Sequence, residues 1–248
     1  MKATLFEFRY RWWVIATIFF VSFGTYFFDH VNSAEALADW RVSQLGGAAT
    51  YNTYRLIFGV GTVLLGVAAF FRTWGTAYLR ADVMRDVRVH TERLVANGPY
   101  RYVRNPLYFG NILMATAIGL MASRIGFFLL AIGMTIFVIR LLLREESDLL
   151  RDQGESYRDY CEAVPRLLPS LVPRVPEGEN MAHWGQAFRA EVMYWLLAVA
   201  MVSFAITLNI KVFWAIFAAA MIGSFVYKRP GSVDKNEAAP GSQPGEPH

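Results

Sequence analysis

The sequence predicts an all-α protein, a polytopic membrane bundle of about six transmembrane helices. Three observations favour this fold class. Hydrophobic residues make up 55% of the 248 residues and charged residues only 18%, whereas an average soluble domain carries about 25% charge. Six apolar stretches are each about 16 to 19 residues long, close to the length that a helix needs to cross hydrocarbon. Basic residues alternate between the segments that connect these stretches.

The six predicted spans lack the strong 3.6-residue polar periodicity of a helix in a soluble bundle. They cover residues 12–28, 56–74, 106–122, 125–143, 192–208 and 212–227. The third and fourth spans are joined by residues 123–124, and the fifth and sixth by residues 209–211. Helices joined so tightly pack as antiparallel hairpins. The first span also resembles a signal peptide that ends at Ala34-Glu35-Ala36, but its length and many aromatic residues favour a retained helix.

The distribution of Lys and Arg predicts the orientation of the helices. The amino-terminal end, residues 72–104, residues 144–191 and the chain after residue 227 hold 19 of the 24 basic residues, and the intervening loops hold three. Because basic segments stay in the cytoplasm, both termini are predicted to be cytoplasmic. The predicted organisation is a first helix with an external loop (1–54), a membrane core (55–175), a C-terminal hairpin (176–230) and a disordered tail (231–248).

The composition also excludes several classes of protein. The chain has one cysteine, Cys161, so an internal disulfide and a cysteine-based zinc site are excluded, and four scattered histidines argue against a metal enzyme. Cys161 is predicted to be a small buried apolar residue. The net charge of +4 is interpreted as a topology signal and not as a sign of nucleic-acid binding. The predicted partners are membrane lipids and a lipophilic substrate from the bilayer, and the oligomeric state stays open.

The most specific motif is GPYRYVRNPLYFG, residues 98–110. Asn105 is predicted to cap the third span and Pro106 to be its first helical residue. A helix start offers free N–H groups and a partial positive charge that attract anions, and Arg101 and Arg104 add to that charge. Three tyrosines supply flat faces for a ring or a cation: Tyr100, Tyr102 and Tyr108. An interfacial anchor of Tyr and Arg is the alternative interpretation.

The second motif is REESDLL, residues 144–150, at the cytoplasmic end of the fourth span. Adjacent carboxylates at a membrane interface are costly to desolvate unless they are paired. Since neighbours on a helix point about 100° apart, either Glu145 or Glu146 can face a pocket and hold an ammonium group while the other meets Arg144, Arg151 or solvent. Salt bridging at the helix end is the alternative. Because the third and fourth spans form a tight hairpin, the two motifs are predicted to converge on one interfacial site.

The third motif is GESYRDYCEAVPRLLP, residues 154–169. Four residues at helical spacing predict a short amphipathic helix at the membrane interface: Tyr157, Tyr160, Cys161 and Val164. Pro165 ends this helix. Arg166 follows near the membrane, where it can orient an anionic substrate. A lipid-facing helix with a snorkelling arginine is the alternative.

In this order, the three motifs resemble the membrane superfamily of isoprenylcysteine carboxyl methyltransferases and phospholipid N-methyltransferases, over roughly residues 55–172. The resemblance implies S-adenosylmethionine as the cofactor and a lipid or lipophilic methyl acceptor. Motifs and resemblance together predict a cofactor-binding set on the cytoplasmic side: Tyr100, Arg101, Asn105, Pro106, Tyr108, Gly110, Glu145 and Glu146. They predict Arg104 and Arg166 as catalytic residues, Tyr157 and Tyr160 as substrate-binding residues, and no metal ligand.

One departure from the family pattern concerns Asn105, because many members have His at this place. Asn can form hydrogen bonds, but it cannot act as a base. The phospholipid branch often has Asn here. The acceptor stays open between an isoprenylcysteine carboxylate and a phospholipid amine. A carboxylate is already ionised, whereas an amine must first lose a proton, and the sequence contains no convincing base.

Two alternative functions remain at this point. The late Tyr-Cys and Val-Pro pairs of residues 160–165 resemble membrane sterol reductases, which use NADPH. The pair Glu145 and Glu146 argues against NADPH, because carboxylates attract an ammonium group and repel a phosphate. A non-enzymatic membrane protein is the other alternative.

Overall fold

The computed structural model describes residues 2–79 and 96–227. Within these ranges the chain is helical, with isolated bridges and no strand. The all-α fold class is therefore confirmed. The predicted tail, residues 231–248, and the central part of the basic segment 72–104 lie outside the described residues.

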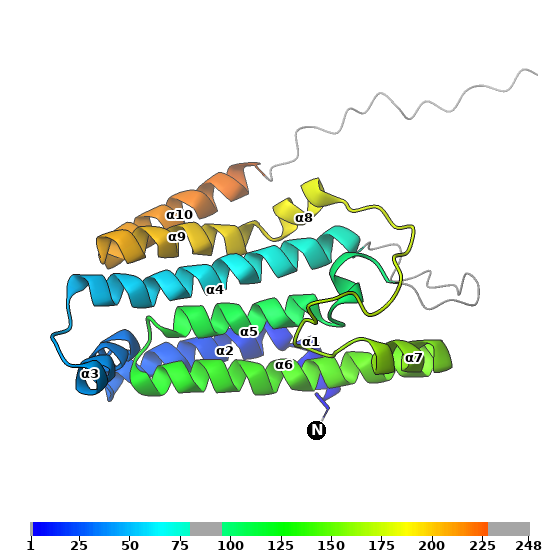
Figure 1. The fold of residues 1–248 in the computed structure, drawn as a ribbon, viewed down its shortest axis with the longest axis horizontal. Coiled ribbons are helices and arrows are strands. Elements are labelled where there is room, and N and C mark those ends of the chain that lie inside the picture. Colours follow the sequence, from blue (N-terminus) through cyan, green and yellow to red (C-terminus); the bar gives the residue numbers. More distant parts are fainter. Residues whose placement is uncertain (1, 80–95, 228–248) are drawn as a thin grey trace, which may run out of the picture.

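The longer helices lie side by side along one axis, with α3 at one end of the bundle and α7 at the other (Figure 1). The elements are α1 (Leu5–Arg9), α2 (Arg11–Gly24), η1 (Thr25–Phe27), α3 (Ser33–Leu45), α4 (Tyr51–Tyr78), η2 (Gly98–Arg101), α5 (Pro106–Gly119), α6 (Arg124–Gln153), α7 (Glu155–Ala163), α8 (Trp184–Ala190), α9 (Val192–Thr207) and α10 (Ile210–Tyr227). The predicted hairpins are present as α5–α6 and α9–α10.

The prediction of six spans is only partly confirmed. Helices occupy all six places, but within the described ranges only α4 and α6 are long and apolar enough to cross a membrane alone. Helices α8 and α9, bent by 63° at their junction, make a third span if they are taken together. The 14 residues of α2 measure about 21 Å, less than the roughly 30 Å of hydrocarbon. The apolar stretch continues beyond Gly24, but the helix gives way there to η1.

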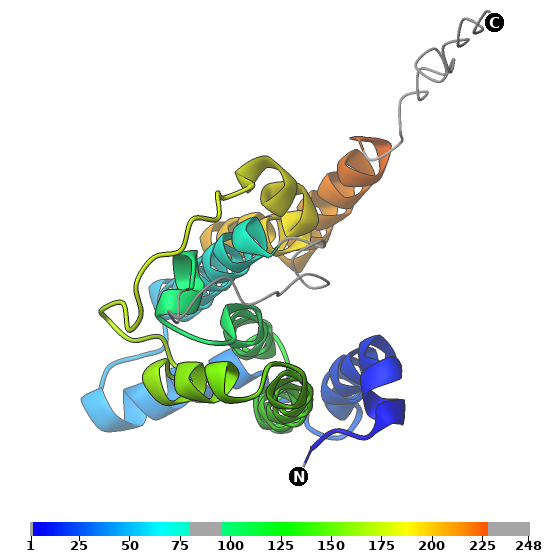
Figure 2. The ribbon, with the colours of Figure 1, turned by 90° about the vertical axis from the view of Figure 1, so that its right-hand side faces the viewer.

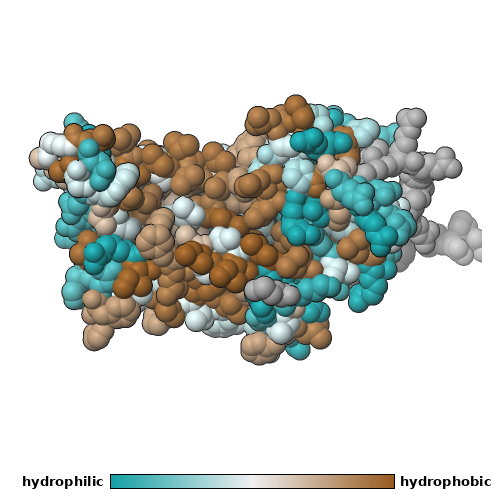
Figure 3. Space-filling model, turned by 60° about the horizontal axis from the view of Figure 1, so that its bottom comes forward, coloured by the Kyte–Doolittle hydropathy of each residue, from teal (hydrophilic) through white to brown (hydrophobic). Residues whose placement is uncertain are grey.

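The surface nevertheless has the character of a membrane protein. Apolar side chains cover the middle of the bundle, between two more hydrophilic ends (Figure 3). Large apolar side chains such as Phe20, Val63 and Phe128 are exposed. Soluble monomers rarely expose so many large apolar side chains, and with the apolar helices α4 and α6 this indicates an integral membrane protein.

The loop between α2 and α3 clamps the start of α6. The Ser123 hydroxyl accepts a hydrogen bond from the Gly126 amide at 3.1 Å. Asp29 accepts one from the Ile125 amide at 3.0 Å and pairs with Arg124 at 3.0 Å. These contacts satisfy free N–H groups in the first turn of α6 and hold α2 against this end of the bundle.

Helix α1 covers a charge in the apolar part of α6. The Arg140 Nη2 atom lies 2.7 Å and 2.9 Å from the two carboxylate oxygens of Glu7. The Ala3 amide donates to the Arg140 carbonyl at 3.0 Å. A charged residue within an apolar helix is costly unless it is paired, so Glu7 gives Arg140 the partner that this position requires.

We expect the contribution of Glu7 to stability to disappear in acid. The hydrogen bond from Arg140 lowers the pKa of the Glu7 carboxyl from 4.5 to about 2. Its stabilisation is therefore complete above about pH 4.5, where the unfolded chain is also ionised, and is lost as the pH falls towards 2. At pH 6 the wild type should unfold a few degrees above Glu7→Gln in detergent. A temperature difference that stays constant down to pH 2.5 would contradict this assignment.

Candidate functional site

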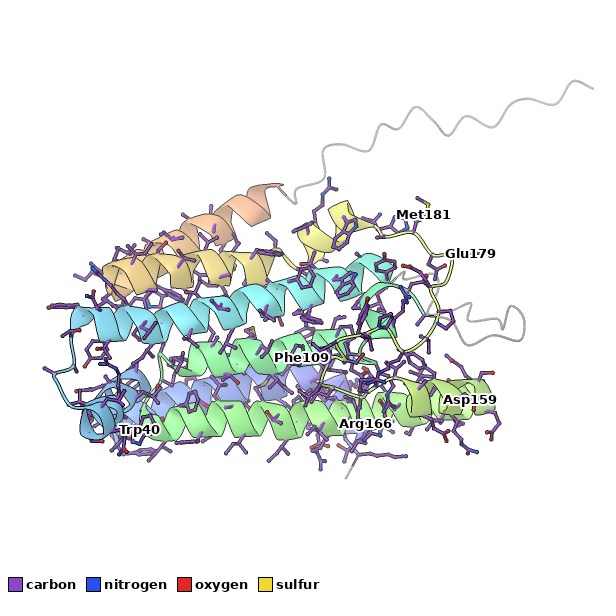
Figure 4. The ribbon with its side chains drawn as sticks, in the orientation of Figure 1. Trp40, Phe109, Asp159, Arg166, Glu179 and Met181 are labelled. Atoms are coloured by element: carbon purple, nitrogen blue, oxygen red, sulfur yellow. The ribbon has the colours of Figure 1, made fainter. Side chains whose placement is uncertain are left out.

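The structure brings the first two motifs together where α5 begins and α6 ends. The Tyr108 hydroxyl donates to Oε1 of Glu145 at 2.8 Å. The Asn105 Nδ2 donates to Oε1 of Glu146 at 3.2 Å. Arg166 lies at the same end of the bundle, opposite the end that carries Trp40 (Figure 4). The hairpin geometry thus places a carboxylate pair beside a helix start.

Glu146 is the buried centre of this site, with only 4% of its surface exposed. Its Oε1 lies 2.9 Å from Nη1 of Arg104, and its Oε2 lies 3.0 Å from Nε of Arg166. One carboxylate therefore joins two arginines and Asn105. Buried charges need partners, and every partner of Glu146 among the described residues is a side chain of the protein. Glu146 therefore holds these side chains in position.

Arg104 carries hydrogen-bond donors with no acceptor. Its side chain is 8% exposed, and among the described residues its Nε and Nη1 atoms make no hydrogen bond. The contact of Nη1 with Glu146 is an ion pair by distance only. Buried donors without acceptors are costly, and an anion bound next to Arg104 would satisfy them.

Glu145 offers a carboxylate oxygen to a ligand. Its Oε1 accepts from Tyr108. Across residues 2–79 and 96–227, no polar partner contacts its other oxygen, Oε2. The half-buried Glu145 is thus the carboxylate of the pair that can still receive a cation.

Among the described residues, neither Glu145 nor Glu146 pairs with Arg144 or Arg151, which the sequence had left open as partners. Arg144 and Arg151 instead lie 3.9 Å and 3.6 Å from Asp148. The sequence could not predict the partners of Glu145 and Glu146. Spacing along one helix identifies only partners within that helix, whereas Tyr108 and Arg104 belong to another part of the chain.

Asn105 is the N-cap residue of α5, as predicted, but its side chain does not bond to the first turn of the helix. Its amide group donates instead to Glu146 and to the Arg166 carbonyl, the latter at 3.0 Å. Pro106 is the first helical residue, as predicted. The Asn105 side chain therefore leaves the N–H groups in the first turn of α5 uncapped.

Arg101 contacts the loop that follows α7. We call residues 165–183, which connect α7 to α8, the strap. Arg101 donates to the Val175 carbonyl at 3.1 Å and pairs with Glu177 at 2.9 Å. Backbone amides of Ser170 and Arg174 also donate to residues of the first motif. Arg101 therefore holds the strap across the site, and the structure does not bring it to Glu145 or Glu146.

The tyrosines of the first and third motifs pack together inside the protein. The Tyr160 hydroxyl donates to the Tyr100 carbonyl at 2.7 Å. Tyr157 and Val164 are buried, so the apolar face of α7 contacts the protein and not the lipid that the sequence suggested. Burial raises the pKa of Tyr100, Tyr157 and Tyr160 above the ordinary value. Cys161 is half-buried, not buried as predicted.

Gly110 allows the close approach of α5 to α4 and does not face the carboxylates. A Cβ atom there would lie 2.5 Å from Cγ of Arg72 and 3.0 Å from the Ala68 carbonyl. We expect Gly110→Ala to destabilise the protein by about 1 to 3 kcal/mol, because it overpacks this contact. Gly59→Ala is the control, since its Cβ would meet nothing within 4 Å. Equal unfolding temperatures for both variants would contradict the close packing.

Sequence reasoning missed a second buried ion pair. Glu191, at the junction of α8 and α9, lies 2.6 Å from Nε of Arg72 and accepts from Thr76 at 2.8 Å. Arg72 also donates to Asn111 at 2.8 Å, and the Tyr194 ring covers its guanidinium at 4.1 Å. The pair joins α4, α5 and α9 next to the first turn of α5. The available signal was a charge inside the end of one apolar stretch, at Arg72, and another directly before the next, at Glu191, since such charges need partners.

The comparison with known families agrees with the resemblance drawn from the motifs. The family model described as phospholipid methyltransferase matches residues 54–153. The match covers 100 of the 248 residues and includes η2, α5, α6 and all but the first three residues of α4. No curated protein and no solved structure matches the chain. The matched region holds both carboxylates and Arg104, whereas α7, the strap and the α9–α10 hairpin lie beyond it.

Proposed function

We propose that this protein, whose core matches the phospholipid methyltransferase family, is an integral membrane enzyme that transfers a methyl group from S-adenosylmethionine to a lipid acceptor. The single observation that carries the proposal is that one site holds both a carboxylate oxygen of Glu145 without a polar partner among the described residues and a buried Nε donor of Arg104 that makes no hydrogen bond. Glu145 can thus bind a cation and Arg104 an anion within the same site. The amino-acid part of the cofactor carries an ammonium group and a carboxylate, so the donor set fits it.

Each group of the site then helps to bind or orient the cofactor or the acceptor. Glu145 would bind the ammonium group through Oε2, and Arg104 with the free N–H groups at the start of α5 would bind the carboxylate. When bound, S-adenosylmethionine supplies a methyl group activated by its sulfonium. Glu146 keeps Arg104 and Arg166 in place. The strap excludes water from one side of the site. Alignment and water exclusion are the main tasks of the protein in a direct displacement.

The acceptor belongs to one of two lipid classes, a phospholipid amine or an isoprenylcysteine carboxylate. Arg166 is half exposed beside Glu146 and would face the reacting end of the acceptor. We further propose that the site faces the cytoplasm. It lies at the end of the bundle that holds α7 and the strap, where the basic segments gather.

Calorimetry on the full chain in nanodiscs tests this function. S-adenosylhomocysteine and NADPH would be titrated side by side, followed by methyl transfer to phosphatidylethanolamine and to a prenylcysteine. Saturable binding of S-adenosylhomocysteine, without binding of NADPH, is the expected result. Binding of NADPH alone would move the protein to the reductases. Binding of neither ligand by folded protein would overturn the proposal.

A further inference from the structure

A cavity of about 830 Å³ lies between α2 and α10, beyond the site along the bundle. Its walls carry aromatic side chains such as Phe19 and Phe23 of α2 and Phe213 and Phe217 of α10. The floor comes from α4, α5 and α9. Helix α2 packs against α6 and α10 packs against α9, so the two walls stand apart, as Figure 2 shows. The cavity therefore faces the surrounding lipid between two helices.

The lining of the cavity selects an apolar occupant. Its polar side-chain groups are those of Tyr26 and Asn32 and the indole N–H of Trp214, and all its other lining residues are apolar. The Tyr26 hydroxyl donates to the Met121 carbonyl at 2.9 Å, and Asn32 donates to Tyr26 at 2.7 Å. The polar groups of Tyr26 and Asn32 already have partners, so they offer little to a polar ligand. A hydrocarbon chain fits both the lining and the membrane setting.

The cavity and the candidate site share helix α5. Met114 and Ile118 line the cavity. They follow Tyr108 by six and ten residues, or roughly 9 and 15 Å along a helix. One leaflet of hydrocarbon is roughly 15 Å thick, half of the bilayer core. A lipid with its reacting end at the site can therefore place its chain in the cavity.

We propose that this cavity binds the hydrocarbon chain of the methyl acceptor and that the α9–α10 hairpin, outside the family match, forms one of its walls. The inference rests on the proposed function. Lipid tails are as apolar as the cavity, so a chain gains no hydrophobic free energy by leaving the bilayer. A selective occupant is therefore a lipid whose head is held at the site, and under the proposed function that lipid is the acceptor.

Photolabelling in nanodiscs tests the inference without requiring activity. Two probes would be used, phosphatidylethanolamine and a prenylcysteine, each with a diazirine at the end of its chain. We expect one probe to label peptides of α5 or α10, and excess unlabelled lipid of the same class to compete. Met114→Trp and Phe23→Trp, which fill the cavity from opposite sides, should each lower this labelling about tenfold. Ile132→Trp, on the exposed face of α6, is the matched control and should leave it unchanged.

The outcomes separate the inference from the proposed function. Labelling spread evenly over lipid-facing helices, insensitive to both cavity-filling variants, would overturn the inference even if S-adenosylhomocysteine binds. Competitive labelling of the cavity without S-adenosylhomocysteine binding would overturn both the acceptor assignment and the proposed function. Unfolding temperatures near that of the wild type confirm that each variant is folded, and the two variants act on different helices.

Discussion

Replacing Glu146 by alanine is expected to abolish S-adenosylhomocysteine binding and to destabilise the protein by about 3 kcal/mol or more. Glu146 is buried and its two oxygens meet Arg104 and Arg166. Its removal leaves the buried charge of Arg104 without a counterion. Asn105 also loses its carboxylate partner. Calorimetry gives the loss of binding, and thermal unfolding in detergent gives the loss of stability.

Glu155→Ala is the control for this change. Glu155 is also a glutamate paired with an arginine, but its side chain is 75% exposed on α7. Exposed ion pairs contribute about 1 kcal/mol or less, so this variant should keep both binding and stability. A Glu146→Ala variant as stable as the wild type would show that Arg104 does not depend on Glu146 as its counterion.

The second large effect is expected at Glu145 and separates binding from stability. Glu145→Gln keeps an oxygen that can accept from Tyr108 but removes the negative charge that the ammonium group would meet. A hydrogen bond to a charged group contributes about 1.5 to 3 kcal/mol, so the affinity for S-adenosylhomocysteine should fall about 10- to 100-fold. The unfolding temperature should change little.

Tyr108→Phe tests the same contact from its other side. It removes the donor to Glu145 but leaves the charge, so a loss of only a few-fold in affinity is expected. A loss at Tyr108→Phe that exceeds the loss at Glu145→Gln would show that the tyrosine, and not the carboxylate, meets the ligand. If neither variant changed the affinity for S-adenosylhomocysteine, Glu145 would not be part of the binding site.

Local features of the sequence predicted much of the fold. Apolar stretches predicted the helices, and short turns predicted the α5–α6 and α9–α10 hairpins. Pro106 predicted the first residue of α5, because proline has no N–H to lose there. The α5–α6 hairpin in turn predicted that residues 98–110 would meet residues 144–150. Helix lengths were less predictable, since apolar composition continues past the end of α2 at Gly24.

The tertiary structure decided which polar groups became partners. Asn105 can cap a helix or donate to a carboxylate, and the position of Glu146 settled the choice. Arg101 binds the strap and not the carboxylates of the site, because Glu177 and the Val175 carbonyl lie within its reach. The pairing of Arg72 with Glu191 joins residues 119 positions apart.

The sequence by itself therefore determined the helical class, the two hairpins and the meeting of the two motifs, since these follow from composition and short-range spacing. It did not determine the separate roles of Glu145 and Glu146 or the cavity between α2 and α10. The physical reason is that a buried charge takes its partner from whichever helix packs against it, and a cavity forms where two helices do not pack. Both depend on how distant segments are arranged in space.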